Sequence, residues 1–354
     1  MAKSIRIENC SIGSEHPPYI VAEMSANHNG EIERAYRILD AVKAAGANAV
    51  KIQTYRADTI TINHSAPEFI VKGGLWDGRQ LYDLYEEAYT PWDWHGPIFD
   101  HAKKIGLTIF SSPFDPTAVD LLESLGAPAY KIASPELIDL PLIKYVARTG
   151  KPIIMSTGMA NLEEISEAIE AARSAGAEDI VVLHCTSAYP TDPKESNLAT
   201  MAEIADRFDV LTGLSDHTPG TTVPAIAIAL GANLIEKHFT LARSDGGVDS
   251  AFSLEPAELA ELVQAARIAK VAVGHASFEP TTSEKKILKM RRSLYVVSPI
   301  SKGEEFSESN IRSIRPGLGL KPKYFEQILG RRASRDIQFG EPLQPSMIDG
   351  GLEV

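Results

Sequence analysis

Eight short apolar runs alternate with stretches of helical periodicity, and this alternation constrains the fold more than any other feature of the chain. Each run is almost continuously apolar, as expected of a parallel strand whose two faces are both buried. Between the runs, apolar residues follow helical spacing and form a single stripe, as in IERAYRILDAVKAAG. The runs span residues 19–25, 49–55, 107–113, 129–134, 152–158, 180–187, 211–218 and 233–241.

Eight β-then-α units within about 255 residues predict an α/β fold of the (β/α)8 (TIM) barrel type. A doubly wound sheet is the alternative, but such a sheet rarely has eight evenly spaced strands. The opening IRIENCSIGSEHPPYI predicts a hairpin that closes the lower end of the barrel. The long segment 56–81 follows the second run and contains Trp76 and several glycines, which favour an ordered substrate loop.

The alternation stops near residue 275, so a different kind of structure is expected beyond it. Residues 276–291 are polar and irregular and predict a linker. Residues 292–354 combine short strand-like runs with many turn residues. The sequence therefore predicts a barrel domain at 1–275, which includes the hairpin, and a small β-rich domain at 292–354.

The composition is that of a globular protein, with 44% hydrophobic and 23% charged residues. No apolar stretch approaches the ~20 residues of a membrane span, so no membrane partner is expected. The opening MAKSIRIENC lacks the apolar core of a signal peptide. Cys10 and Cys185 are the only cysteines, which argues against a disulfide framework. We therefore expect a cytoplasmic protein.

The net charge of −12 argues against nucleic acid as a partner. The charge is unevenly spread, because residues 285–335 hold 13 Lys and Arg against 4 Asp and Glu. This segment thus has a surplus of +9, and the rest of the chain carries −21. Such a basic tail is either a solvated face or a surface that meets an anionic ligand or an acidic neighbour.

Polar side chains end the apolar runs, where the active sites of such barrels lie. Lys51 and Lys131 stand in the similar frames VKIQ and YKIA. A buried ammonium group needs an anion beside it, and serines at other strand ends add hydroxyl donors. Lysines surrounded by hydroxyls point to a phosphate or carboxylate ligand, with structural ion pairing as the alternative.

Two neighbouring runs, LTGLSDHT and NLIEKHFTL, contain His217 and His238 at matching ends. A barrel would place both imidazoles within reach of one metal ion, for which Mn²⁺, Mg²⁺, Fe²⁺ and Co²⁺ all remain open. The absence of Cys ligands disfavours a structural zinc site. An anionic substrate beside a metal-activated carbonyl indicates either carbon–carbon bond formation or isomerisation of a sugar phosphate.

Eight motifs resemble, in their order, those of the sialic acid synthase family. Residues 292–354 are similar to the antifreeze-like (SAF) domain of those enzymes, so the resemblance covers essentially the whole chain. Within the family, residues 74–99 resemble the pseudaminic acid synthases. The motifs are VAEMSANHNG, AVKIQTY, FSSPFD, YKIASPEL, PIIMSTGMA, LHCTSAYPT, GLSDHTPG and IEKHFTL.

The resemblance implies a barrel enzyme that condenses phosphoenolpyruvate with an open-chain amino sugar. In the pseudaminic acid branch this sugar is 2,4-diacetamido-2,4,6-trideoxy-L-altrose, and the products are pseudaminic acid and phosphate. Synthesis of N-acetylneuraminate or legionaminate is the nearest alternative. More distant alternatives are a metal-dependent isomerase or aldolase on the same barrel, and a sugar-binding protein without activity.

The resemblance also implies residue roles. Glu23 would position water or handle a proton, and His217 and His238 would be catalytic through a divalent ion, Mn²⁺ or else Mg²⁺ or Co²⁺. Arg315 would reach the sugar in the barrel of a second chain, within a domain-swapped homodimer. One departure is Ala242, where many relatives have an acid. Phosphoenolpyruvate would be held by Lys51, Ser111, Lys131, Ser134, Ser156, Ser187 and Ser215, and the sugar by Gln53, Glu136, Tyr189, Asp249 and Arg315.

Overall fold

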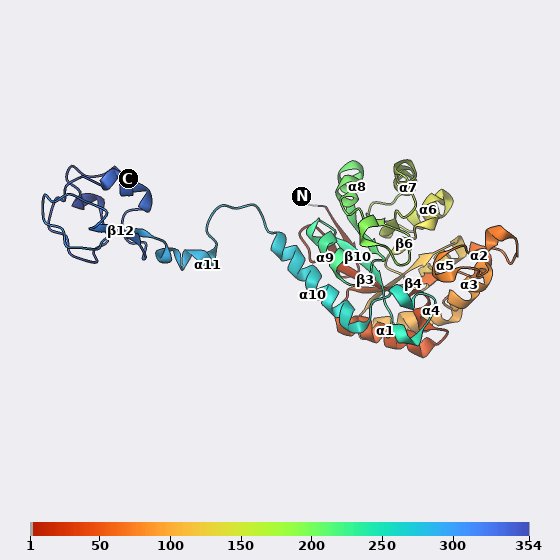
Figure 1. The fold of residues 1–354 in the computed structure, drawn as a ribbon. Coiled ribbons are helices and arrows are strands. Elements are labelled where there is room, and N and C mark those ends of the chain that lie inside the picture. The colour runs from red at the N-terminus through yellow and green to blue at the C-terminus, as the bar shows by residue number, and fades with distance from the viewer. Residues whose placement is uncertain (1–2, 354) are drawn as a thin grey trace. The chain divides into compact units, whose positions relative to one another are not determined.

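The computed structural model describes residues 3–353 and divides into two compact units, Met1–Gly274 and His275–Val354. The first unit is a closed barrel of eight parallel strands, in which each strand pairs with the next along the chain and the last, β10, pairs with the first, β3 (Figure 1). The predicted (β/α)8 barrel is therefore confirmed. The strands are β3 (Tyr19–Glu23), β4 (Ala49–Thr54), β5 (Thr108–Pro113), β6 (Tyr130–Ile132), β7 (Ile153–Ser156), β8 (Ile180–Cys185), β9 (Leu211–Asp216) and β10 (Leu234–His238).

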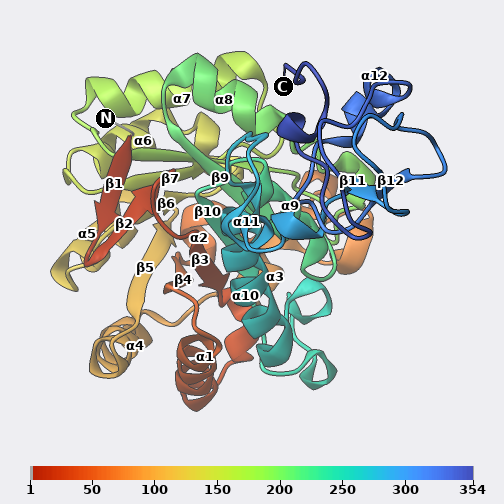
Figure 2. The ribbon, with the colours of Figure 1, turned by 90° about the vertical axis from the view of Figure 1, so that its left-hand side faces the viewer.

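Helices surround these strands, as the two ribbon views show (Figures 1 and 2). Two of them, α2 (Ala57–Ile60) and α3 (Leu81–Ala88), flank the long segment after β4 and lie outside the regular alternation. Among the described residues, no helix is long and apolar enough to cross a bilayer. The other helices of the unit are α1 (Ile32–Ala45), α4 (Trp92–Ile105), α5 (Pro116–Ser124), α6 (Leu140–Ala147), α7 (Leu162–Ser174), α8 (Thr200–Phe208), α9 (Thr222–Ala229) and α10 (Pro256–Val273).

Local sequence signals account for the helix boundaries. Helix α7 begins at the cap residue Asn161, whose side chain accepts hydrogen bonds from the backbone N–H groups of Glu163 and Glu164. Helix α1 ends at Gly46, which has a φ of 82°, a left-handed conformation that glycine adopts without strain. These signals fix where each helix starts and stops between successive strands.

The barrel has two apolar layers, because alternate residues of each strand point to opposite faces. Side chains on the outer face, such as Val50 and Ile109, pack against the helices. Side chains on the inner face, such as Val21, Phe110 and Ile154, fill the lower part of the barrel. The interior is therefore a packed core rather than a pore.

An antiparallel hairpin of β1 (Ser4–Ile7) and β2 (Cys10–Gly13) precedes the barrel. Its buried side chains Ile5, Ile7 and Ile12 belong to the same apolar cluster as the inward-pointing residues of the barrel. The hairpin thus seals the amino-terminal end of the barrel and leaves the carboxyl ends of the strands open.

The second unit has its own apolar core, built around Leu294, Phe306 and Ile337. Strands β11 (Ser293–Val296) and β12 (Ile311–Ile314) pair antiparallel, and the short helix α12 (Phe325–Ile328) follows them. The segment expected to be an irregular linker contains another short helix, α11 (Thr282–Lys285). Its boundaries arise from a capping box between Thr281 and Glu284.

Candidate active site

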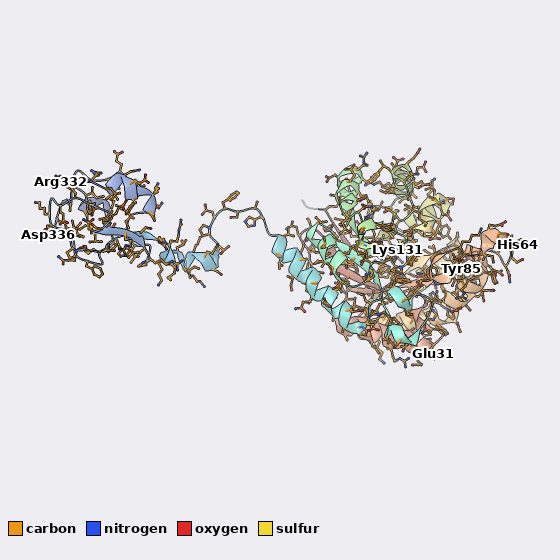
Figure 3. The ribbon with its side chains drawn as sticks, viewed as in Figure 1. Glu31, His64, Tyr85, Lys131, Arg332 and Asp336 are labelled. Atoms are coloured by element: carbon orange, nitrogen blue, oxygen red, sulfur yellow. The ribbon has the colours of Figure 1, made fainter. Side chains whose placement is uncertain are left out.

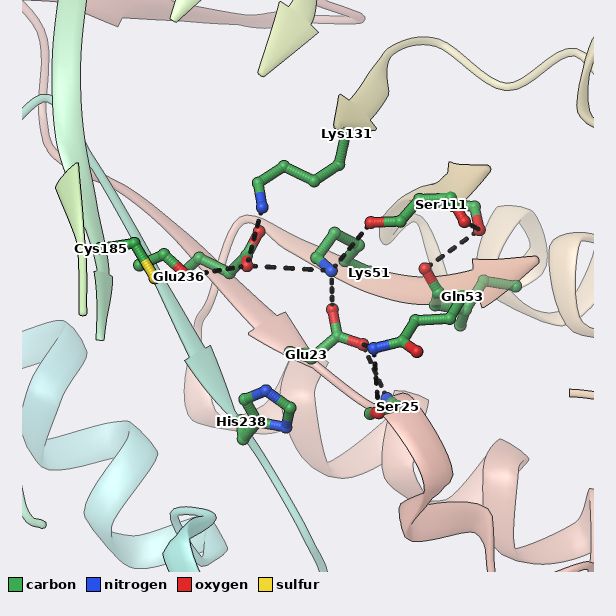
Figure 4. A network of polar contacts seen from close by, with 12 residues as sticks. Glu23, Ser25, Lys51, Gln53, Ser111, Lys131, Cys185, Glu236 and His238 are labelled. Carbon is green, nitrogen blue, oxygen red and sulfur yellow. Dashed lines mark hydrogen bonds and ion pairs between the residues drawn. The ribbon is translucent and has the colours of Figure 1, made fainter. Parts of the chain in front are cut away.

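Four charged side chains form a continuous chain of ion pairs inside the barrel (Figure 4), in which Figure 3 marks the position of Lys131. The Lys51 ammonium contacts the Glu23 carboxylate and lies 3.8 Å from Oε1 of Glu236. The same Oε1 lies 3.4 Å from Nζ of Lys131. All four side chains are at most 7% exposed. Each lysine therefore has a glutamate partner, and the two positive charges balance the two negative ones.

Burial and charge pairing oppose one another in this group. Burial raises the pKa of Glu23 to about 7, although the neighbouring Lys51 acts in the opposite direction. Burial also disfavours ionisation of Glu236, but Lys131 and Lys51 together hold its pKa below the ordinary value. Burial lowers the pKa of Lys131. Glu23 can therefore gain or lose a proton near neutral pH, whereas Glu236 stays charged.

The serine on β5 that faces this group is Ser112, not Ser111. Nζ of Lys51 donates to the Ser112 hydroxyl at 3.2 Å. The Ser111 hydroxyl instead lies 2.6 Å from the Thr54 hydroxyl and donates to the Ile52 carbonyl at 3.0 Å, on the outer face of the strand. Neighbouring strand residues point to opposite faces, so Ser112 shares the inner face with Lys51 whereas Ser111 does not, and a role of Ser111 towards the substrate stays a prediction.

Hydroxyl groups gather around the backbone of Gly158. The Ser134 hydroxyl accepts from the Gly158 N–H at 3.0 Å. A Cβ added to Gly158 would lie 2.7 Å from this hydroxyl and 2.1 Å from that of Ser187, so only glycine fits here. The buried hydroxyl of Ser156 has no hydrogen-bond partner within residues 3–353. This arrangement offers unused donors to an anion beside Lys131.

The two predicted histidines lie together at the ends of β9 and β10. Their ring centroids are 5.4 Å apart. Nδ1 of His217 lies 3.1 Å from the carbonyl oxygen of Thr186, which leaves its Nε2 available. Burial holds the pKa of His238 well below its ordinary value, so its imidazole is neutral. Its Nδ1 is buried without a hydrogen-bond partner among the described residues, and a metal ion would satisfy such an atom.

The side chains expected to face the sugar occupy different parts of the site. Nε2 of Gln53 donates to the Ser25 hydroxyl at 3.0 Å, beside Glu23. The Tyr189 ring lies 4.4 Å from the His217 ring, and Oδ2 of Asp249 lies 3.8 Å from Nδ1 of His238. Ser215, which was expected to hold phosphoenolpyruvate, donates to Glu236 at 3.2 Å. Arg315 belongs to the second unit, where it is exposed.

Sequence reasoning missed the central role of Glu236. This carboxylate contacts both lysines and Ser215, three side chains from three other strands. The available signal was its spacing of two from His238 on the same strand, which places both side chains on the inner face. Its partners could not be read from local sequence because they lie 21 to 185 positions away along the chain.

The Glu136 carboxyl gives a prediction about pH and stability. Burial raises its pKa from an ordinary value of 4.5 to about 7, so the folded protein holds this proton more tightly than the unfolded chain. The free energy of unfolding should therefore fall as pH rises through this window. We expect Glu136→Gln to raise the thermal unfolding midpoint by a few degrees at pH 8 and by much less at pH 5, which lies only just above the ordinary pKa of the unfolded carboxyl.

Glu167→Gln is the matched control, because Glu167 is exposed on α7. Glu167→Gln should cause only a small change in the thermal unfolding midpoint, and the change should be the same at pH 5 and pH 8. An equal shift for Glu136→Gln at pH 5 and pH 8 would contradict the prediction. The same variant should lower activity if Glu136 contacts the sugar. Higher stability together with lower activity would show that the buried carboxylate serves function at a cost in stability.

A parallel barrel with buried lysines, unused hydroxyl donors and paired imidazoles at its open end defines a (β/α)8 enzyme for anionic substrates. Comparison with known proteins identifies the family within this class of enzymes. Residues 38–278 match the NeuB family and residues 291–349 match the SAF domain. The chain therefore belongs to the NeuB family.

Several relatives align along almost the whole chain. Pseudaminic acid synthase from Helicobacter pylori is 45% identical over 339 residues, which cover 95% of this chain and 99% of the relative. Pseudaminic acid synthase from Campylobacter jejuni serotype O:23/36 is also 45% identical and covers 93% and 96%. Among solved structures, the N-acetylneuraminic acid synthetase from Leptospira borgpetersenii has a TM-score of 0.73 and 30% identity, covering 81% of this chain and 96% of its own.

Proposed function

We propose that this chain synthesises pseudaminic acid by condensing phosphoenolpyruvate with 2,4-diacetamido-2,4,6-trideoxy-L-altrose and releasing phosphate. The observation that carries the proposal is the 45% identity to three pseudaminic acid synthases over 92–95% of the chain. Relatives named as synthases of other sialic acids are more distant. The two legionaminic acid synthases are 34% and 38% identical, and a murine N-acetylneuraminate-9-phosphate synthase is 31% identical.

The lysines and serines suit the phosphate and carboxylate of phosphoenolpyruvate. Lys131 contacts Glu236, and the unpartnered Ser156 hydroxyl lies on the neighbouring strand β7, so an anion held by both would gain a cation and a hydroxyl donor. Lys51 and Ser112 would hold its other end, because they already contact each other. These fixed donors would stabilise negative charge throughout the reaction.

Glu23 is the candidate for proton transfer, since its pKa of about 7 suits a general acid or base at neutral pH. In the condensation, C3 of phosphoenolpyruvate bonds to the aldehyde carbon of the sugar, and water adds at C2. The resulting tetrahedral intermediate expels phosphate as its C–O bond breaks. Glu23 would orient this water and accept its proton, while Gln53 is held beside Glu23 through Ser25.

The two imidazoles fit a divalent ion, Mn²⁺ or else Mg²⁺ or Co²⁺. The fit rests on their proximity and on the unpartnered Nδ1 of His238. No three His, Cys, Asp or Glu side chains within residues 3–353 converge as a complete metal site. Substrate and water would therefore supply the remaining ligands. The bound ion would polarise the sugar aldehyde as a Lewis acid.

The basic second unit supports a role for a second chain in the site. Residues 285–335 carry a surplus of +9 against −21 elsewhere, so unlike regions of two chains should attract each other. We place Arg315 in the sugar site of a partner subunit, which makes the enzyme a domain-swapped homodimer. Cys10 and Cys185 are free thiols, in agreement with a cytoplasmic location.

The decisive experiment measures phosphate release from phosphoenolpyruvate against a panel of acetamido sugars, with the product mass as a second readout. We expect turnover with 2,4-diacetamido-2,4,6-trideoxy-L-altrose and much less with N-acetylmannosamine. With ¹⁸O in the bridging position of phosphoenolpyruvate, the label should appear in phosphate because the C–O bond breaks. Label in the sugar acid would refute this bond cleavage, and preference for another sugar would refute the assigned substrate.

A further inference from the structure

A row of aromatic rings leads outward from the two histidines. The Tyr189 and His217 rings are tilted against each other with centroids 4.4 Å apart, and the Phe252 ring lies 5.2 Å from that of Tyr189 and 4.9 Å from that of His238. The Trp76 ring lies 5.6 Å from that of Tyr189. Trp76 and Phe252 have no part in the chemistry proposed above.

Trp76 reaches this row from a distant part of the chain and is held there. It belongs to the long segment between α2 and α3, whereas Phe252 follows β10. The indole N–H of Trp76 donates to the backbone carbonyl of Val248 at 3.1 Å. This hydrogen bond joins two loops 172 positions apart and fixes the orientation of the indole. Trp76 is half-buried, so its apolar surface is only partly used by the protein itself.

An open-chain sugar that extends along this row is long enough to pass Tyr189 and to approach Trp76. A sugar whose aldehyde carbon lies at the imidazoles extends across five carbon–carbon bonds of about 1.5 Å each, a reach of roughly 6 Å. From His217 the rings continue 4.4 Å to Tyr189 and a further 5.6 Å to Trp76. The far end of a sugar that extends along this row, C6, therefore falls between the Tyr189 and Trp76 rings, close enough to contact both. In the 6-deoxy sugar this carbon is a methyl group.

We propose that Trp76, together with Tyr189 and Phe252, forms an apolar wall that selects an acceptor sugar ending in a methyl group over one ending in a hydroxymethyl group. The inference rests on the proposed function, because it names what this site distinguishes among acetamido sugars. The added hydroxyl would lose its water contacts against aromatic carbon and find no polar partner there. Trp76 is therefore a specificity-determining residue.

The test compares two acceptors, 2,4-diacetamido-2,4,6-trideoxy-L-altrose and its 6-hydroxy analogue, by kcat/KM from phosphate release. An apolar wall rejects an added hydroxyl by up to about 100-fold. Trp76→Gln removes the apolar surface but keeps an N–H donor, and it should lower the preference for the methyl sugar about 10-fold. Trp76→Phe keeps an aromatic wall but loses the indole N–H, and it should retain most of the preference. The KM for phosphoenolpyruvate should not change in either variant.

Leu75→Gln is the matched control, because the neighbouring Leu75 is 48% exposed. It should leave the ratio of the two kcat/KM values unchanged. If Trp76→Gln lowers activity equally for both sugars, Trp76 only orders the loop and the inference is wrong. If the wild-type chain uses neither sugar, the proposed function itself fails. These two failures are distinct, since the first requires an active wild-type enzyme.

Discussion

Replacing His217 with alanine should lower turnover at least about a thousandfold. The variant leaves His238 as a single imidazole, so the site should bind a divalent ion much more weakly. A Lewis acid lowers the activation barrier by several kcal/mol. Each 1.36 kcal/mol corresponds to a tenfold change in rate. Phosphate release gives the turnover, and calorimetric titration with Mn²⁺ gives the metal affinity independently of activity.

His101→Ala is the control, because His101 lies on α4 and pairs with Asp40 outside the site. It should keep full activity and metal affinity. Excess chelator should inactivate the wild-type enzyme, and added Mn²⁺ or Co²⁺ should restore it. Full turnover in excess chelator would overturn the metal proposal.

The inactive His217→Ala chain also allows a test of the swapped dimer. Arg315→Ala should be poorly active for a different reason, the loss of a sugar contact. If each site combines a barrel with the Arg315 of the partner subunit, mixed dimers contain one site with both residues intact. Mixing the two variants should then restore activity. Mixed dimers without recovered activity would show that Arg315 does not act across subunits.

Lys237→Met should lower the free energy of unfolding of the barrel by about 3–5 kcal/mol. The Lys237 ammonium is 2.5 Å from Oδ2 of Asp216 and also donates to the Thr218 carbonyl, with both side chains at most 2% exposed. Without Lys237, the Asp216 carboxylate keeps its hydrogen bonds from Thr218 but loses its counter-charge. Urea unfolding, followed through the transition of the barrel, measures the loss.

Lys151→Met is the matched control for this loss. Lys151 pairs with Glu123 at 2.6 Å, but the two side chains are 26% and 39% exposed. An exposed pair contributes at most about 1 kcal/mol, so the control should cost far less than Lys237→Met. Equal losses would mean that burial of the Asp216–Lys237 pair does not matter. Because Asp216 directly precedes His217 and Lys237 directly precedes His238, Lys237→Met should also weaken metal binding.

Periodicity was enough to predict the barrel, because nearly continuous apolar strands and amphipathic helices leave few other packings. It also placed Lys51, Lys131 and the two histidines at the open ends of strands. The ion pairs among them were beyond prediction, since they depend on closure of β10 against β3 and on the reach of long side chains. A shift of one position decides which face of a strand a side chain occupies, so the sequence alone did not show that Ser112 lies beside Lys51.

The hairpin of β1 and β2 closes the amino-terminal end of the barrel, so the site is approached from the other end. Its isoleucines belong to the apolar cluster that fills the lower end of the barrel, so substrates must reach the lysines from the carboxyl ends of the strands, where the loops that hold Tyr189 and Trp76 lie. Under the proposed function, the three-carbon substrate sits deep and the sugar sits above it. For this reason we expect ordered binding and release. Phosphoenolpyruvate binds first, the sugar then blocks its exit, and phosphate is released only after the sugar acid has left.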